Sequence, residues 1–157
     1  MDYKKSEAKE YAREHLVGVW AANLTPFDDA LRVDEKAYRE NLDHWIKDLQ
    51  LGGLFIAGKQ AEFFSMSIPE RKRLMEMSVE AAQAAGDRGG IGRCGIITSC
   101  SDTNLDVVLD LAQHSQNIGA DYVIVHSPVL HFGADTDETI YEYYRHLSEK
   151  LDIGLAM

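Results

Sequence analysis

Four polar turns carry most of the side chains that could do chemistry, and each follows a short apolar run. They contain two threonines, a lysine, a cysteine and two histidines, and they span residues 23–26, 58–62, 98–101 and 126–131. A lysine ammonium can bind a carboxylate, an imidazole can transfer a proton near neutral pH, and a thiolate can act as a nucleophile. Because the turns that follow parallel strands meet at one end of a β/α fold, we expect these segments to line one mouth.

Other kinds of site lack the spacing that they need. His114 and His146 fall within predicted helices, and the sequence contains neither H-x-x-E-H nor C-x-x-C, so we expect no metal ion. The glycines of residues 89–92 precede a strand, whereas a dinucleotide fingerprint links a strand to the helix that follows it, so we expect no nucleotide cofactor. Cys94 and Cys100 are too close in sequence to staple a secreted domain, and we expect buried free thiols.

Composition narrows the class of protein and its partners. The 157 residues include 26 acidic and 16 basic side chains, which give a formal charge of −10, and 45% of the residues are apolar. An acidic chain repels phosphate backbones, so a nucleic-acid partner is not expected. The sequence has no run of about 18 apolar residues that would span a membrane, and its start lacks the apolar region of a secretory signal. We therefore expect a cytoplasmic globular protein.

The elements that must position the polar turns alternate between apolar strands and amphipathic helices. Residues 1–16 form an arm or a short helix. Helices are predicted to begin after Asp34, at the capping box of Ser67 and Glu70, near Thr103 with Asp106, and near Asp137. Short strands are predicted at residues 17–22, 54–57, 94–98 and 122–125, and a fifth begins at 153–157.

Two α/β architectures fit four strand-and-helix units and the opening of a fifth. An open, doubly wound sheet of the flavodoxin type would be complete at this length. A (β/α)8 barrel needs about 250 residues and would be only half present. The apolar strand at residues 153–157, with no covering helix after it, favours the barrel slightly.

Several motifs, taken in order, are similar to one family. The chain resembles the dihydrodipicolinate synthase and N-acetylneuraminate lyase family of Schiff-base aldolases, which are (β/α)8 barrels. The resemblance implies that residues 17–157 are the N-terminal half of such a barrel, truncated after the start of its fifth strand. It rests on Leu24-Thr25-Pro26-Phe27, Gly58-x-x-x-Glu62, Ser67-x-x-Glu70-Arg71, Gly119-Ala120-Asp121 and Pro128.

The same resemblance implies roles for residues in the polar turns. In the family, a Gly-Thr-Thr-Gly-Glu turn holds the carboxylate of a 2-oxo acid, and here Lys59, Gln60 and Ala61 take its central positions. We therefore expect Lys59 and Gln60, together with Thr25, to bind substrate, although a solvated loop lysine is an equal alternative. Glu62 is expected to be a structural carboxylate. His126 and His131 are further candidates for the mouth. Cys100 could also face it, but a packing role is favoured for this cysteine.

The resemblance places the catalytic residues of the family outside this chain. Its imine-forming lysine and its tyrosine on the fifth strand would follow Met157, and Pro128-Val129-Leu130 stands where synthases carry Pro-Tyr-Tyr. The resemblance thus implies a divergent lyase or hydratase-aldolase that acts on pyruvate or another small 2-oxo acid, without a cofactor, as a homo-oligomer when full-length. The alternative is a non-enzymatic, flavodoxin-like module that binds a small acid or a protein partner.

Overall fold

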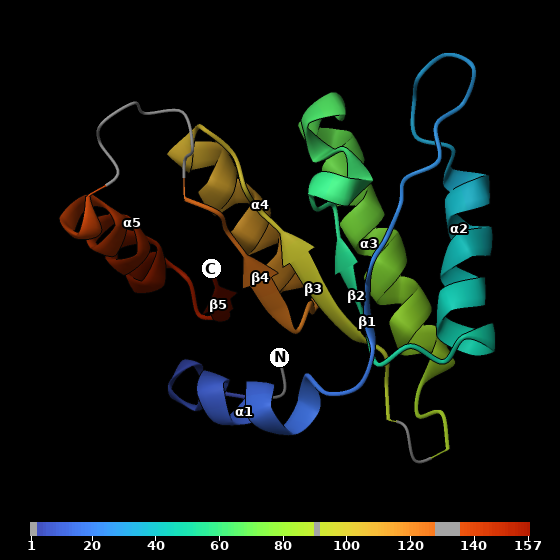
Figure 1. Ribbon diagram of the computed structural model, residues 1–157, viewed down its shortest axis with the longest axis horizontal. Coiled ribbons are helices and arrows are strands. Elements are labelled where there is room, and N and C mark those ends of the chain that lie inside the picture. Colours follow the sequence, from blue (N-terminus) through green and yellow to red (C-terminus); the bar gives the residue numbers. More distant parts are fainter. Residues whose placement is uncertain (1–2, 90–91, 128–135) are drawn as a thin grey trace.

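A sheet of five parallel strands, which helices connect along the chain, forms the centre of the molecule (Figure 1). The computed structural model describes residues 3–89, 92–127 and 136–157. The strands are β1 (Trp20–Ala22), β2 (Gly53–Ile56), β3 (Gly95–Ser99), β4 (Tyr122–Ile124) and β5 (Gly154–Ala156). The helices are α1 (Ala8–His15), α2 (Glu35–Asp43), α3 (Ile68–Ala85), α4 (Leu105–Ile118) and α5 (Asp137–Lys150). None of these described helices has both the length and the apolar composition of a membrane span.

The order of the strands decides between the two architectures. Each strand pairs in parallel with the next one along the chain, in the order β1-β2-β3-β4-β5. A flavodoxin-like sheet has the order 2-1-3-4-5, whereas strands of a β/α barrel follow one another in sequence. The prediction of the N-terminal part of a barrel is confirmed, and the flavodoxin-like alternative is not supported.

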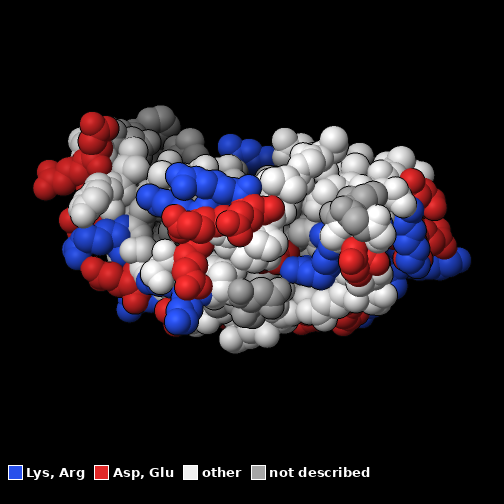
Figure 2. All heavy atoms as spheres, turned by 90° about the horizontal axis from the view of Figure 1, so that it is seen from below, with Lys and Arg blue, Asp and Glu red and all other residues white. Residues whose placement is uncertain are grey.

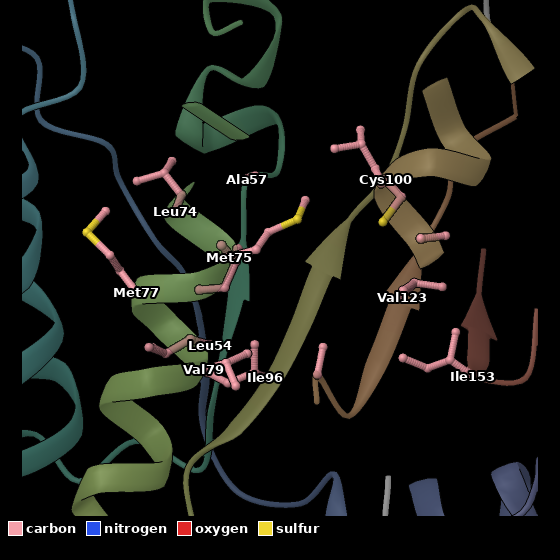
Figure 3. Packing of buried hydrophobic residues seen from close by; sticks show 14 of the residues in the cluster. Leu54, Ala57, Leu74, Met75, Met77, Val79, Ile96, Cys100, Val123 and Ile153 are labelled. Atoms are coloured by element: carbon pink, nitrogen blue, oxygen red, sulfur yellow. The ribbon is translucent and has the colours of Figure 1, made fainter. Parts of the chain in front are cut away.

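The two faces of the sheet differ because successive residues of a strand point to opposite sides. One face packs against the helices and is fully buried, with Leu54, Ile56, Ile96 and Val123 among its members (Figure 3). The other face carries Phe55, Ile97 and Ile124, which the described chain buries only in part. On a barrel this second face is the interior.

Aromatic rings lie over glycines on the interior face. A Cβ atom added to Gly53 or Gly95 would lie 2.3 Å or 2.5 Å from the indole ring of Trp20. In the same way, a Cβ on Gly154 would lie 2.2 Å from the ring of Tyr122. The glycines of these strands therefore leave room for the large rings of neighbouring strands.

The helix starts mostly follow the prediction. The Asp34 carboxylate accepts a hydrogen bond from the Ala37 amide at 3.0 Å, and Ser67 and Glu70 form the expected capping box. The cap of α4 is a correction, because Asn104, and not Thr103, accepts the hydrogen bond from the Asp106 amide.

Several strand ends differ from the prediction by one residue, and two other differences are larger. The first strand begins at Trp20 and not at residue 17, since Gly18 has a φ of +86° and interrupts the extended backbone. The helix that starts after Asp34 ends in a π-helical turn, His44–Asp48, and this change of period leaves Leu49 exposed.

Candidate functional site

A cavity of about 390 Å³ lies at the C-terminal ends of β2, β3 and β4. This volume is in the range of small-molecule sites, and the C-terminal ends of the strands are where β/α barrels place their active sites. The lining residues come from three of the four turns that the sequence singles out, together with the start of α3. They are Lys59, Phe63, Phe64, Met66, Ile68, Arg71, Ser101, Asp102, Thr103, His126 and Ser127.

The turn after β2 is built from two short 3-10 helices, Lys59–Ala61 and Phe63–Ser65. Ala57 and Glu62 have φ angles of 55° and 57°, so two residues of this turn take the positive φ that non-glycine residues rarely adopt. The Thr25 hydroxyl donates a hydrogen bond to the Ala61 carbonyl at 3.0 Å. Thr25 thus fastens the loop after β1 to the turn after β2, and its hydroxyl is already engaged with the backbone.

Lys59 is the predicted substrate-binding residue that lines the cavity. Its side chain is exposed, and the described part of the chain offers its ammonium neither a hydrogen bond nor an ion pair. In a protein with a formal charge of −10, an unpaired cation beside a cavity favours an anionic ligand. Gln60 is exposed and lies outside the cavity lining, so of these two neighbouring residues only Lys59 lines the cavity.

Glu62 has a different environment from the one predicted. Its backbone occupies the left-handed region, and its side chain is exposed. Among the described residues the Glu62 carboxylate has no hydrogen-bond partner, whereas its backbone carbonyl accepts from the Ser65 amide at 2.8 Å. Its contribution is therefore to the shape of the turn through the backbone.

Arg71 forms the floor between α3 and the turn after β3. Only 2% of this residue is exposed, and its guanidinium donates to the Asp102 carboxylate at 3.0 Å and to the Ser101 carbonyl at 2.8 Å. The Arg71 guanidinium carbon also lies 4.8 Å from the centre of the Phe63 ring, a cation-π distance. Burial lowers the pKa of Arg71, and the charge of Asp102 opposes that change.

His126 follows β4 and faces the same cavity as Lys59. Its backbone amide donates to the Ser101 hydroxyl at 3.0 Å, so the turn after β3 fixes the start of the turn after β4. Burial and then the positive charge of Lys59 lower the pKa of the His126 imidazole below its ordinary value of 6.5. The neutral imidazole is therefore the favoured form at pH 7, and it can accept a proton.

Cys100 is not at the mouth, so that alternative is wrong, whereas the expectation of a buried thiol in a packing role is confirmed. It is completely buried, and its sulfur lies near the hydroxyls of Ser115 (3.6 Å) and Thr98 (3.9 Å). Figure 3 shows it in the same cluster as Val123 and Ile96. Burial raises the pKa of the Cys100 thiol to about 11, which removes the thiolate that nucleophilic chemistry needs. His131 lies outside the described residues.

The apolar wall and the buried arginine are the parts of the site that the sequence analysis missed. Phe63 and Phe64 contact each other edge to face, with ring centres 5.6 Å apart, and Phe64 is 70% exposed. The signal for Arg71 was available, since Ser67-x-x-Glu70-Arg71 was singled out as a motif. Within the described ranges, no three His, Cys, Asp or Glu side chains are grouped closely enough to hold a metal ion.

Comparison with known proteins assigns the fold to a family. Residues 15–155 match the model of the dihydrodipicolinate synthetase family. The chain belongs to this family. An uncharacterized DapA-like lyase of Thermococcus kodakarensis is 30% identical over 140 residues, which are 89% of this chain and 44% of the relative. A 4-hydroxy-tetrahydrodipicolinate synthase of Brucella abortus is 30% identical, over 90% of this chain and 45% of the relative.

N-acetylneuraminate lyases are relatives in both sequence and structure. The enzyme of Clostridium perfringens is 27% identical over 90% of this chain and 46% of its own length. The crystal structure of the Clostridium difficile protein CdNal in complex with mannosamine has a TM-score of 0.76 and 25% identity, and covers 88% of this chain and 44% of that one. The chain therefore spans less than half of the length of the relatives that it matches.

Proposed function

We propose that this chain is the substrate-binding part of a lyase that acts on a small 2-oxo acid such as pyruvate. The observation that carries the proposal is the ammonium of Lys59 beside the cavity at the C-terminal ends of the strands, where no other described residue pairs with it. Lys59 takes the place, after β2, where the family holds the carboxylate of its substrate. An N-acetylneuraminate lyase of Fusobacterium nucleatum that shares this fold, with a TM-score of 0.74 and 21% identity, was crystallised in complex with pyruvate.

In this proposal each residue of the mouth has a separate task. Lys59 binds the carboxylate by charge, and the hydrogen bond of Thr25 to Ala61 holds the turn in place. Neutral His126 lies within electrostatic range of Lys59 and is suited to accept a proton from a substrate group near that carboxylate. The imine-forming lysine of the family is expected in the part of the relatives that this chain does not span.

For the complete protein we also propose a location, an oligomeric state and a type of reaction. We expect a cytoplasmic homo-oligomer that needs no cofactor, with a reaction that differs from dihydrodipicolinate synthesis because Lys59 and Gln60 replace the two threonines. The runner-up, a non-enzymatic open sheet, is disfavoured by the sequential strand order.

Steady-state kinetics of the complete gene product test the role of Lys59. The Lys59→Met variant should raise KM for the 2-oxo acid by about 10-fold to 100-fold and change kcat little, because a charge-assisted contact of about 1.5–3 kcal/mol is lost from ground state and transition state alike. Lys36→Met is the control, since that ammonium is exposed on α2 and weakly paired with Glu40 at 4.0 Å. An unchanged KM in Lys59→Met would contradict the assignment.

Borohydride trapping tests the chemistry independently of binding. The complete gene product, incubated with pyruvate and borohydride, should gain the mass of a reduced imine, and the Lys59→Met variant should still form this adduct at saturating pyruvate. The 157-residue chain alone should form none, because a lysine amine must be desolvated or lie next to a cation before it is neutral often enough to attack a carbonyl. A stoichiometric adduct on Lys59 would show that this residue is the nucleophile and that the proposed division of roles is wrong.

A further inference from the structure

Residues 3–15 lie across the N-terminal ends of the strands, opposite the candidate site. Figure 1 shows α1 beneath β4 and β5. The match to the family model begins at residue 15, so nearly all of this arm lies outside the matched residues. Seen from this side, lysines, arginines and acidic residues are interspersed without a large patch of one sign (Figure 2). Because the arm lies opposite the candidate site, the proposed reaction does not explain why these residues pack against the sheet.

A stack of aromatic rings joins the arm to the sheet. The ring centres of Tyr122 on β4 and Tyr3 are 6.0 Å apart, those of Tyr3 and Tyr11 are 4.2 Å apart, and those of Tyr11 and His15 are 4.3 Å apart. The Tyr122 ring also covers Gly154 at the start of β5. The stack thus begins on the interior face of the sheet and ends at the last residue of α1. Aromatic pairs of this kind stabilise a fold by more than the burial of their surface area alone.

The hydroxyls of Tyr3 and Tyr122 form hydrogen bonds with the backbone at the start of β5, directly before β4 and in α1. Tyr3 accepts a hydrogen bond from the Gly154 amide at 2.8 Å and donates to the Asp121 carbonyl at 2.5 Å. Tyr122 donates in the opposite direction, to the Ala8 carbonyl in α1, at 2.5 Å. The Tyr3 hydroxyl thus bridges the Gly154 amide, at the first residue of β5, and the Asp121 carbonyl, directly before β4.

Asp121 connects this arrangement to β3. Its carboxylate accepts from the Tyr11 hydroxyl at 2.7 Å and from the Ile96 amide at 2.7 Å, and it pairs with Arg93. The residue is 4% exposed, so a buried charge is held by three donors, one from α1 and two from β3 and the residues directly before it. The arm is therefore part of a network that reaches β3, β4 and β5 together.

From these contacts we infer that residues 3–15 form an intramolecular strap, which closes the N-terminal end of the sheet and holds the start of β5 in register with β4. Tyr3 is the fastening residue, because its single hydroxyl joins the backbone of Gly154 to that of Asp121. Tyr11 and Tyr122 hold the strap in place through Asp121 and Ala8. This role is independent of the proposed lyase activity, since the strap and the cavity lie at opposite ends of the strands.

Amide hydrogen exchange on the complete gene product tests the strap. Tyr3→Phe keeps the ring and removes the hydroxyl, so exchange at the Gly154 amide should become at least about 10-fold faster. Deletion of residues 1–15 should also speed exchange at the Val125 amide, which donates to Ala156 across β4 and β5 at 3.1 Å. The Asn23 amide, which donates to Phe55 between β1 and β2, should exchange at its original rate in both variants.

Two further measurements separate a strap from a general loss of stability. A synthetic peptide of residues 1–16, added to the deletion variant, should restore protection at Gly154 and Val125. Tyr141→Phe is the matched control, because Tyr141 is a tyrosine that is 65% exposed on α5. If the deletion variant does not fold, Tyr3→Phe alone carries the test. Unchanged exchange at Gly154 in Tyr3→Phe would overturn the inference, as would equal acceleration at Asn23 and Gly154.

Discussion

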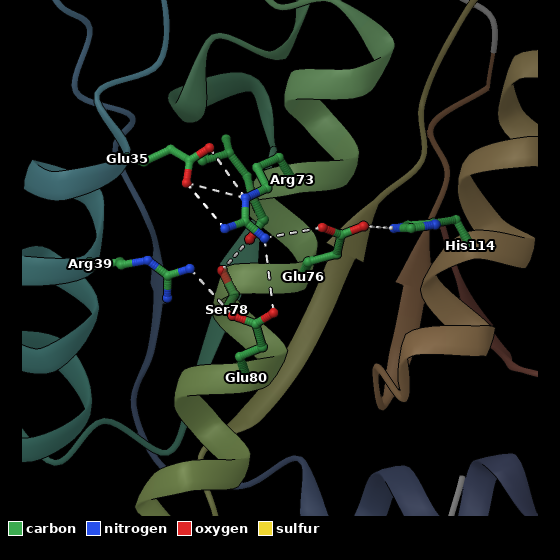
Figure 4. Close-up of polar contacts among 8 residues, drawn as sticks. Glu35, Arg39, Arg73, Glu76, Ser78, Glu80 and His114 are labelled. Carbon is green, nitrogen blue, oxygen red and sulfur yellow. Dashed lines mark hydrogen bonds and ion pairs between the residues drawn. The ribbon is translucent and has the colours of Figure 1, made fainter.

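The guanidinium of Arg71 donates to the Asp102 carboxylate at 3.0 Å, and this ion pair joins the first turn of α3 to the turn after β3. The same guanidinium holds the carbonyls of Ser99 and Ser101. Two residues further along α3, Arg73 lies instead on the surface in an open network with Glu35, Glu76 and Glu80, which Figure 4 shows. Neighbouring arginines of one helix thus provide a buried and an exposed ion pair for comparison.

Removal of the charge at Arg71 should be far more costly than removal of the charge at Arg73. Arg71→Gln leaves the Asp102 carboxylate and two carbonyls without their donor, and we expect the free energy of unfolding to fall by about 3–5 kcal/mol. Arg73→Gln removes only solvent-screened pairs and should change it by less than about 1 kcal/mol. Urea unfolding of both variants gives this comparison directly, and equal effects would show that the Arg71 pair is as weak as a surface pair.

The capping box of α3 should make stability depend on pH in the acid range. The Glu70 carboxylate accepts from the Ser67 hydroxyl at 2.7 Å and from the Ser67 amide at 2.9 Å, and these bonds lower its pKa below 4.5. A lowered pKa means that the carboxylate stabilises the fold above pH 4.5 and that this contribution is lost as the pH falls through the lower value.

Glu70→Gln should therefore reduce the melting temperature most above pH 4.5, with parent and variant converging at lower pH. Thermal unfolding between about pH 3 and pH 7 measures this difference. Glu40→Gln is the control, because Glu40 is exposed on α2 and lies 4.0 Å from Lys36. A constant difference between parent and Glu70→Gln across this range would contradict the role of the ionised carboxylate.

The fold was largely readable from the sequence because its signals are local. The helix caps at Asp34 and Ser67 depend only on residues within one or two turns of the same helix. The apolar runs are long enough to identify four strands. Gly95 is an unfavourable residue for β3 when the sequence is considered alone, since a glycine inside a strand weakens it. Its reason lies on another strand, where the Trp20 ring needs the space that a side chain would fill.

The site was predicted less completely, because its walls come from segments that only the fold brings together. Lys59 and His126 follow strands and were found at the edge where the sequence placed them. The buried position favoured for Cys100 follows from the period of two along β3, which puts it on the same face as buried Ile96 and Thr98. The contact of Arg71 with Phe63 depends on how α3 begins, which the motif alone does not show.

Burial of Cys100 predicts that its thiol is inert in the folded protein. Its pKa of about 11 keeps it protonated at pH 8, and Cys94 is buried with a raised pKa as well. Titration with a thiol reagent at pH 8 should therefore find no rapidly reacting cysteine in the native chain and two in urea. Rapid native labelling that mass spectrometry assigns to Cys100 would show that the thiol does reach the mouth.

The last prediction concerns the 157-residue chain on its own, which we expect to associate. Its outermost strands, β1 and β5, each pair on one side only within the described sheet, and such edges join to other edges. The interior face leaves Phe55, Ile97 and Ile124 partly exposed, while Val19 and Met157 are 71% and 78% exposed. Light scattering after size exclusion should give a mass above that of one chain, and the mass should rise with concentration.

Val19→Lys places a charge beside β1 and should reduce the association. A concentration-independent monomer that unfolds cooperatively would show that the edges and the interior face are already satisfied within one chain.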